Sequence, residues 1–320
     1  MTDVRSYSPS LLPALVRFWN RGFSDRRNFF PVTEEIVRRR VIEKRTSVER
    51  FEPSLFLVAV DGDEIVGAIH AGIRPEELCR VLHPEWPGGT QGYIALFFVQ
   101  QGHRNRGVGT ELWRRAHSAL SGVKQVVLDG QCLNPFYGNS EGPFTPFWGT
   151  PEGISVLWSD SATKRFFARR GYAPRFKALQ LEIAIDQARF EAPEAAGLEV
   201  RVSDSHYPDL DTPYPGRARY AAGGAFECAA ALQEGRTVGV LSWYPLAEVE
   251  PGRYAIFEAL VAERMRGKGV GRTLLAVALR RMREAGARRC DVLTIPEVSE
   301  AAYRLYLEAG FSKVEEWAVY

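Results

Sequence analysis

The fold is decided by the run Ile256-Phe-Glu-Ala-Leu-Val261 and the turn that follows it, Arg266-Gly-Lys-Gly269-Val-Gly271-Arg272. The same pattern occurs earlier in the 320-residue chain, as Ile94-Ala-Leu-Phe-Phe-Val99 followed by Arg104-Asn-Arg-Gly107-Val-Gly109-Thr110. In both copies the arginine comes five residues after the valine, and glycines come three and five residues after the arginine. Because internal similarity of this kind marks a duplicated structural unit, the sequence predicts two related domains.

Each copy predicts a strand, a glycine-rich turn and a helix, in that order. Apolar residues recur three and four positions apart after both turns, which is the spacing of one helix face. They are Leu112, Trp113, Ala116 and Leu120 in the first copy, and Leu274, Leu275, Ala278, Leu279 and Met282 in the second. Further along, Lys164–Tyr172 parallels Arg304–Phe311, and each predicts a helix that ends at a glycine, Gly171 or Gly310, before a strand. The order of elements therefore repeats as well.

The predicted boundary between the repeats lies at about residue 190, in a connector rich in Pro, Ala and Glu over residues 186–197. This gives an N-terminal domain over residues 1–189 and a C-terminal domain over residues 190–320. The middle glycine of the turn and the glycine after the later helix are 64 residues apart in the first copy and 41 in the second. The first copy therefore carries an insertion of 23 residues, at about residues 132–157.

The insertion is too aromatic for a solvated loop, because each aromatic ring can bury about 150–250 Å². We expect it to be ordered, and to shape a pocket or the domain junction. Its aromatic residues are Phe136, Tyr137, Phe144, Phe147, Trp148 and, just after it, Trp158.

Composition and charge exclude several classes of protein. Hydrophobic residues make up 45% of the chain, which is enough for a core in each domain, and the net charge of +2 supplies no overall field for binding nucleic acid or anionic lipid. The charged start and the absence of a long apolar run argue against a signal peptide and a membrane span, so we expect a cytoplasmic protein. The sequence leaves the oligomeric state open.

The cysteines, histidines and arginine-rich tracts indicate no metal or nucleic-acid site. Cys79, Cys132, Cys228 and Cys290 lie far apart and are expected to be reduced, buried thiols. The arginines of segment 280–289 fall mainly opposite the apolar face of their predicted helix, which favours a solvated surface, and Arg38–Arg40 are interpreted in the same way.

A Gly-x-Gly turn between a strand and a helix is a favourable site for phosphate. The bare N–H groups lie at the positive end of the helix dipole, and a side chain at the glycines would hold a phosphate away from them. The chain has no Gly-x-x-x-x-Gly-Lys-Ser/Thr motif, and the second turn lacks the Gly-x-Gly-x-x-Gly spacing of a dinucleotide site. Arg266, Lys268 and Arg272 add positive charge suited to a pyrophosphate.

These motifs, together with Ala302-x-x-x-Tyr306-x-x-x-Gly310-Phe311, resemble the GNAT superfamily of N-acetyltransferases, and the likeness covers both halves of the chain. The resemblance implies an α/β fold of mixed α+β type: two tandem GNAT-like domains, each a mixed, partly splayed sheet flanked by helices. It also implies that acetyl-CoA is the cofactor, held by its pyrophosphate at the turn, with its pantetheine arm between the splayed strands.

The resemblance assigns the cofactor contacts residue by residue. The pyrophosphate contacts implied are Arg266, Gly267, Lys268, Gly269, Val270, Gly271 and Arg272 in the second half, and Arg104, Asn105, Arg106, Gly107, Val108, Gly109 and Thr110 in the first. Main-chain contacts to the pantetheine and the thioester are implied for Leu260 and Val261, and by parallel for Phe98 and Val99.

Acyl transfer to an amine needs a base for the amine and an acid for the departing thiolate. Tyr306 stands where the family places the acid; the alternative is that Tyr306 is an aromatic residue of the core. Glu258 is the candidate base; the alternative is that Glu258 is a solvated carboxylate and that water relays the proton. The first half has Phe167 at the position of Tyr306, so we expect the chemistry in the second half. The first half would then be a retained CoA site, a structural partner or a wall of the substrate pocket.

Two further positions depart from the family pattern. Asp160 and Ser299 stand where the family often has Asn, so either CoA contacts are remade there or the helix cap has changed.

The leading hypothesis is an acetyl-CoA-dependent N-acetyltransferase for a small-molecule amine. A non-catalytic acyl-CoA-binding sensor, acetylation of a protein amine, and an interaction module that uses the basic helices are the alternatives. The sequence does not identify the acceptor, because the acceptor pockets of this family are built from variable early helices and loops.

Overall fold

The computed structural model describes residues 2–27, 29–43, 51–82, 85–128, 136–137, 154, 156–189, 197–203, 227–247 and 249–320. The described residues divide into two compact units. The first unit contains those up to Tyr137, with Ile154 and Tyr320, and the second contains those from Val156 to Val319. No helix in the described part of the chain is both long and apolar enough to cross a membrane.

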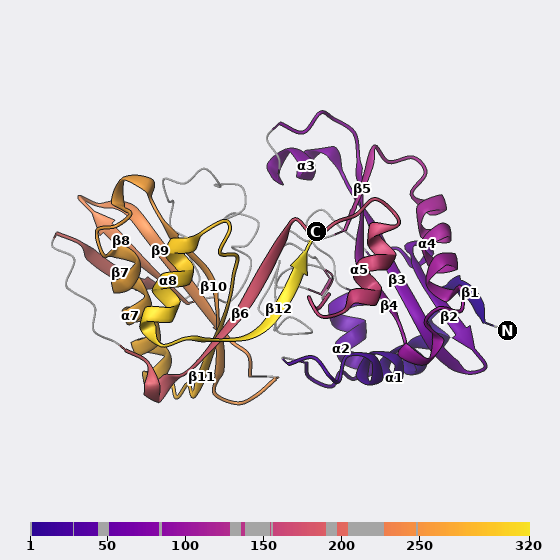
Figure 1. The fold of residues 1–320 in the computed structure, drawn as a ribbon, viewed down its shortest axis with the longest axis horizontal. Coiled ribbons are helices and arrows are strands. Elements are labelled where there is room, and N and C mark those ends of the chain that lie inside the picture. Colours follow the sequence, from indigo (N-terminus) through magenta and orange to yellow (C-terminus); the bar gives the residue numbers. More distant parts are fainter. Residues whose placement is uncertain are drawn as a thin grey trace. The chain divides into compact units, whose positions relative to one another are not determined.

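The first unit is a mixed sheet in the order β1-β2-β3-β4-β5, in which β4 and β5 are the parallel pair (Figure 1). Its strands are β1 (Asp3–Ser6), β2 (Phe56–Asp61), β3 (Glu64–Arg74), β4 (Gln91–Val99) and β5 (Gln125–Leu128). Its α-helices are α1 (Leu12–Gly22), α2 (Glu34–Val37), α3 (Glu76–Leu82) and α4 (Val108–Ala119).

The second unit is a mixed sheet in the order β12-β6-β11-β10-β9-β8-β7 (Figure 1). Its strands are β6 (Phe176–Ala184), β7 (Glu199–Ser203), β8 (Glu227–Gln233), β9 (Arg236–Pro245), β10 (Arg253–Val261), β11 (Arg289–Thr294) and β12 (Ser312–Val319). Its α-helices are α5 (Ser161–Ala168), α7 (Val270–Glu284) and α8 (Glu300–Ala309). The predicted architecture of two mixed sheets with flanking helices is confirmed.

Strand β6 belongs to the first repeat in sequence but to the second sheet in space. It lies between β11 and β12 and is antiparallel to both. Its alternating residues Leu181 and Ile183 are buried in the core of the second unit, so the alternation in the sequence reports the strand correctly but not its sheet. The boundary at residue 190 separates the sequence repeats and stays a prediction for the domains.

A network of buried polar side chains joins β6 to its neighbours. Arg253 on β10 pairs with Asp291 on β11 and with Glu182 on β6, each at 2.7 Å. Gln180 of β6 donates to Asp291 at 3.1 Å and accepts from the Trp317 indole of β12 at 3.1 Å. Because buried polar groups are stable only when they are hydrogen-bonded, this network favours one register for β6 across four strands.

Both sheets carry a β-bulge at the same place in the repeat. The register shifts at Ala95 in β4 and at Phe257 in β10, in each case four residues before the terminal valine. In the second sheet, parallel pairing between β10 and β11 ends at Ile256 and Val292, although β10 continues to Val261. After the bulge, the edge of β10 that faces β11 therefore has no partner strand among the described residues, in agreement with the splayed sheet that the family resemblance implies.

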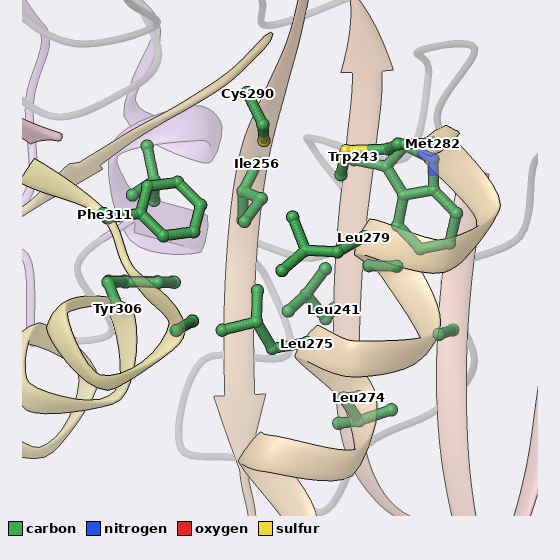
Figure 2. Packing of buried hydrophobic residues seen from close by; sticks show 14 of the residues in the cluster. Leu241, Trp243, Ile256, Leu274, Leu275, Leu279, Met282, Cys290, Tyr306 and Phe311 are labelled. Atoms are coloured by element: carbon green, nitrogen blue, oxygen red, sulfur yellow. The ribbon is translucent and has the colours of Figure 1, made fainter. Parts of the chain in front are cut away.

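The core of the second unit lies between α7 and the sheet. Figure 2 shows Leu275 and Leu279 of α7 pointing towards Leu241 and Ile256 of the strands. These residues are at most 4% exposed. The apolar spacing read from the sequence is therefore the buried face of α7, and the predicted solvated position of the arginines in segment 280–289 is confirmed for this helix, where Arg283 is exposed.

Two further expectations have separate outcomes. The sequence predicts solvated side chains for Arg38–Arg40, and for Arg40 this prediction is wrong. Arg40 is 7% exposed, and its guanidinium lies over the Phe30 ring at 5.8 Å. An apolar partner for the side chain is compatible with a cation because of the negative face of the ring. Within the insertion, Phe136 and Tyr137 are fully buried, while Phe144, Phe147, Trp148 and Cys132 lie outside the described residues. Cys79, Cys228 and Cys290 are buried, as predicted, and no disulfide bond joins them.

Candidate active site

The two glycine turns have the same backbone conformation. Gly107 and Gly269 precede α4 and α7 with φ of 82° and 84°, in the left-handed region that favours glycine. Two residues earlier, Asn105 and Gly267 are also left-handed, with φ of 61° and 75°. The second glycine of each motif, by contrast, lies within the helix. The first glycine is thus required by the backbone, and the second, Gly271, is free to serve close approach of a ligand.

Each turn is closed by the arginine that both copies of the repeat contain. Arg104 Nε donates to the Val99 carbonyl oxygen at 3.0 Å, and Arg266 Nε donates to the Val261 carbonyl oxygen at 3.4 Å. The backbone N–H of each arginine also donates within the turn, to Gln101 or Glu263. These two arginines, predicted as pyrophosphate contacts, therefore have a structural task in addition: they hold the turn against the end of the strand.

The N–H groups at the start of α7 are oriented for an anion. The first backbone bond of the helix runs from Thr273 N to Gly269 O, and the N–H groups before it have no acceptor in a preceding turn. In the second half they are the N–H groups of Val270, Gly271 and Arg272, and Val108 and Gly109 hold the first two of these positions in the first half. Lys268 and Arg272 add two exposed cations in the second half, so the residues present fit a pyrophosphate.

Two strand glycines, which the sequence reasoning missed, bring the helices close to the sheets. A Cβ on Gly239 of β9 would lie 2.9 Å from Val270 Cγ1 and 3.0 Å from Leu274 Cδ1. A Cβ on Gly67 of β3 would lie 3.0 Å from Leu112 Cδ1 and 3.1 Å from the equivalent Val108 Cγ1. A glycine inside an apolar strand indicates such close approach, and both follow a valine, so the signal was present in the sequence.

The edge of the strand before the turn is more open in the second half. Leu260 and Val261 are half-buried, whereas Val99 of β4 is 7% exposed. The ring of Phe98 packs against Phe23 of α1, with ring centroids 4.7 Å apart. Leu260 and Val261 can therefore offer main-chain groups to an extended ligand arm, while the first-half edge is covered by aromatic side chains.

Tyr306 lies beside this open edge, on α8. It is 3% exposed and its ring meets Phe311 edge-on at 5.5 Å (Figure 2). Burial, with the nearby Cys290 and the carboxylate of Glu258, raises the pKa of the phenol. Its hydroxyl has no hydrogen-bond partner in the described part of the chain. Tyr306 is thus held protonated and can donate a hydrogen bond, although full proton transfer costs more than from an unburied phenol.

Glu258 belongs to a row of polar side chains across three strands. It pairs in register with Ser242 of β9, which pairs with Cys228 of β8. Cross-strand partners share one face of a sheet, and this face is opposite to the one that packs on α7. Burial and the Glu258 carboxylate raise the pKa of the Cys228 thiol to about 12, so the thiol stays neutral. The Glu258 carboxylate contributes to the raised pKa of the Tyr306 phenol, a relation that the sequence alone could not show.

Ser242 is a candidate site residue that sequence reasoning missed. Its side chain is fully buried, and no partner of its Oγ is found among the residues described. A buried hydroxyl without a partner is unusual and needs an explanation. Next to Glu258, it is a ready hydrogen-bonding group for a ligand on this face of the sheet.

The first half differs at each of these positions. His70, at the position of Ser242 in the repeat, is paired in register with Leu96 rather than with an acid. The His70 ring is buried and its Nδ1 lies 2.7 Å from the Tyr137 hydroxyl, with Phe136 at 4.5 Å between ring centroids. The insertion therefore covers this position with aromatic side chains.

Asp160 and Ser299 both cap helices. Asp160 Oδ1 accepts from Thr163 N at 3.0 Å at the start of α5, and Ser299 Oγ accepts from Ala302 N at 3.4 Å at the start of α8. Of the two explanations left open for these departures, the changed helix cap is observed.

The profile described as the acetyltransferase (GNAT) family matches residues 17–127 and 194–311, one match in each repeat. The chain belongs to the GNAT family of acetyltransferases. The predicted family, its tandem arrangement and its class, an acyltransferase, are confirmed. A comparison with curated protein sequences gives no match.

Solved structures with a similar fold include other GNAT proteins. A tandem GNAT protein from the clavulanic acid biosynthesis pathway, without AcCoA, has 15% identity over 99% of this chain and 97% of that chain, with a TM-score of 0.66. A GCN5-related N-acetyltransferase from Sphaerobacter thermophilus has 17% identity over 99% and 94%, with a TM-score of 0.62. The glucosamine N-acetyltransferase region of a fungal multi-domain GH3 beta-N-acetylglucosaminidase has 15% identity over 99% and 37%, with a TM-score of 0.64. At these identities, the likeness shows the fold of this GNAT chain and not its acceptor.

Proposed function

We propose that this GNAT chain transfers the acetyl group of acetyl-CoA to the amine of a small molecule, with the chemistry in the second half. The observation that carries the proposal is the buried phenol of Tyr306 beside the open edge of β10, the strand that carries Glu258 and leads into the glycine turn. The turn residues Gly267–Arg272 would hold the pyrophosphate, and Leu260 and Val261 the pantetheine arm. Acetyl-CoA supplies a thioester, whose carbonyl carbon is open to attack by a neutral amine.

In the transfer, a bond forms between the amine nitrogen and the carbonyl carbon, and the carbon–sulfur bond breaks. The amine loses one proton and the departing sulfur leaves with the bonding electron pair. Glu258 takes the proton, directly or through water. The protonated Tyr306 donates a hydrogen bond to the sulfur as negative charge develops on it, so the phenol stabilises the transition state more than the ground state.

The class of acceptor follows from the face that Glu258 shares with Ser242. A carboxylate attracts an ammonium, and a neighbouring serine oxygen can accept a hydrogen bond from it. This favours a small primary amine that is cationic in solution and is deprotonated at the site. Acetylation of a protein amine and an acyl-CoA sensor without turnover are the alternatives.

The test mixes acetyl-CoA with a panel of small amines, including amino acids, amino sugars and polyamines, and with lysine peptides. Release of free CoA thiol and the mass of the acetylated product are measured. We expect thiol release with at least one small amine, and its loss in Glu258→Gln at pH values where the amine is protonated. Binding of acetyl-CoA without thiol release for any amine would favour the sensor, and turnover of peptides alone would favour a protein acceptor.

A further inference from the structure

The β-bulge of β10 places an aromatic ring and the candidate base on the same face of the second sheet. Consecutive residues of a regular strand point to opposite faces. The register of β10 shifts between Ile256 and Glu258, so Phe257 is the extra residue of the bulge. Phe257 packs against Tyr244 on the face that Glu258 shares, opposite α7. Both Phe257 and Glu258 are half-buried, so each keeps part of its surface for a ligand.

The first repeat has the bulge but neither of these two side chains. Ala95 and Leu96 hold the positions of Phe257 and Glu258, four and three residues before the terminal valine of the strand. The register of β4 shifts at Ala95 as that of β10 shifts at Phe257. Because the bulge forms without an aromatic ring or a carboxylate, the fold does not require these two side chains there.

The order of residues along β10 sets the direction in which an acceptor extends. Leu260 and Val261, the proposed contacts of the pantetheine arm, lie between Glu258 and the glycine turn. Phe257 lies on the other side of Glu258. An amine that attacks the thioester beside Glu258 therefore has its carbon skeleton directed away from the cofactor, over Phe257.

The side chains in that direction are aromatic and apolar. The rings of Phe257 and Tyr244 meet at 66°, with their centroids 6.4 Å apart. Leu246 and Ala255 belong to the same cluster. Aromatic rings that meet edge to face gain more than the burial of their area alone, so this cluster favours a third ring over a polar group.

The polar groups of this face suit a single ammonium. Glu258 supplies a carboxylate, and the fully buried Ser242 Oγ has no partner among the residues that the structure describes. The next charged residue of β10 beyond Phe257 is Arg253, which already pairs with Asp291 and Glu182. A second ammonium on the acceptor would meet this guanidinium rather than an available carboxylate.

We propose that the acceptor is an arylalkylamine, a primary amine joined to an aromatic ring by a short alkyl chain. Glu258 and Ser242 bind its ammonium, and Phe257 packs against its ring. A short chain suffices because neighbouring residues of a strand are only about 3.3 Å apart. This inference rests on the proposed function and narrows its acceptor. The bonds formed and broken are those given above, and the products are the N-acetyl arylalkylamine and free CoA thiol.

The experiment measures kcat/KM for four primary amines on the full chain at saturating acetyl-CoA, by release of CoA thiol. The amines are 2-phenylethylamine, ethylamine without a ring, putrescine with a second ammonium, and glucosamine with a polar ring. We expect the value for 2-phenylethylamine to exceed each of the others by about tenfold or more, as for a well-fitted apolar group.

Substitution of Phe257 tests whether this ring is responsible. Phe257→Ala should lower the ratio of kcat/KM for 2-phenylethylamine to that for ethylamine by about tenfold, and Phe257→Leu, which keeps an apolar side chain, should lower it less. The matched control is Phe176→Ala, which removes a half-buried ring of β6 from a separate cluster with Ala178 and Trp317. It should leave the ratio unchanged.

Three results would overturn the inference. Turnover of ethylamine, putrescine or glucosamine that equals or exceeds that of 2-phenylethylamine would assign another class of acceptor and leave the proposed function intact. An unchanged ratio in both Phe257 variants would mean that this ring does not read the acceptor; if neither variant folds, the ranking of the four amines by the wild type decides. Absence of thiol release with every amine would overturn the proposed function and this inference together.

Discussion

Phe167 and Tyr306 occupy the same position in two equivalent helices. Each lies seven residues after a capping side chain, Asp160 or Ser299. The Phe167 carbonyl accepts from Tyr172 N at 3.1 Å, and the Tyr306 carbonyl accepts from the equivalent Phe311 N at 3.0 Å. With the backbone matched in this way, the phenol hydroxyl is a localised chemical difference between the two halves at this point.

The first prediction follows from that hydroxyl. Tyr306→Phe should lower turnover of an acceptor by about a hundredfold or more, because a positioned acid is lost. The dissociation constant of acetyl-CoA should stay nearly unchanged, since the hydroxyl acts mainly in the transition state. Steady-state rates and calorimetry measure the two quantities. Phe167→Leu is the control in the first half and should leave turnover intact; a large loss there with none in Tyr306→Phe would move the chemistry to the first half.

The second prediction concerns the glycine turn. Gly271→Glu should abolish acetyl-CoA binding at the second half, because the new carboxylate meets the pyrophosphate at the helix N-terminus. Leu305 Cδ2, which would lie 3.3 Å from the new Cβ, has to shift only slightly, so the fold should survive, and circular dichroism checks this. Gly109→Glu makes the same change in the first half. Unchanged calorimetric affinity in a folded Gly271→Glu protein would contradict the assignment of the turn.

The local elements of this chain could be predicted from sequence, because their signals are local. The positive φ at Gly107 and Gly269 and the buried face of α7 follow from glycine placement and helical spacing. The insertion of β6 between β11 and β12 could not be predicted in this way. Leu181 pairs with Val292, more than a hundred residues away, and alternation along a strand carries no information about which sheet receives it.

Some residues of the candidate site could likewise be predicted from the sequence, and others could not. Tyr306 and the glycine turn could be found from the sequence, because the spacing of their residues matches a motif of a known family. Ser242 and His70 could not, because each owes its interest to burial beside a bulge rather than to a motif.

The third prediction tests the network of buried polar side chains that holds β6. Asp291→Ala should destabilise the protein by about 3–5 kcal/mol, because it leaves the buried Arg253 without its bidentate partner. The control is Glu199→Ala, which breaks a solvent-exposed pair with Arg201 and should change the free energy of unfolding far less. Urea denaturation followed by fluorescence measures both. Similar small losses of unfolding free energy in the two variants would mean that the polar network does not hold β6 in place.

The last prediction is a pH dependence of the first unit. Burial lowers the pKa of His70 to about 3, from an ordinary value near 6.5, so the folded protein keeps this ring neutral. As the pH falls below 6.5, the unfolded state binds a proton that the folded state does not, and stability is lost. The loss at pH 5 should be about 2 kcal/mol, and it should be absent above pH 7.

Comparison of urea unfolding at pH 7.5 and pH 5 isolates the contribution of this ring. His70→Gln should reduce the difference in unfolding free energy between the two pH values by about 2 kcal/mol, whatever it costs at neutral pH. Tyr137→Phe removes the hydroxyl that lies 2.7 Å from His70 Nδ1 but keeps the aromatic cover. Because desolvation is the cause of the lowered pKa, this variant should retain the pH dependence. An unchanged difference in His70→Gln would show that folding does not lower the pKa of this ring, and that the ring is protonated at pH 5 in the folded protein.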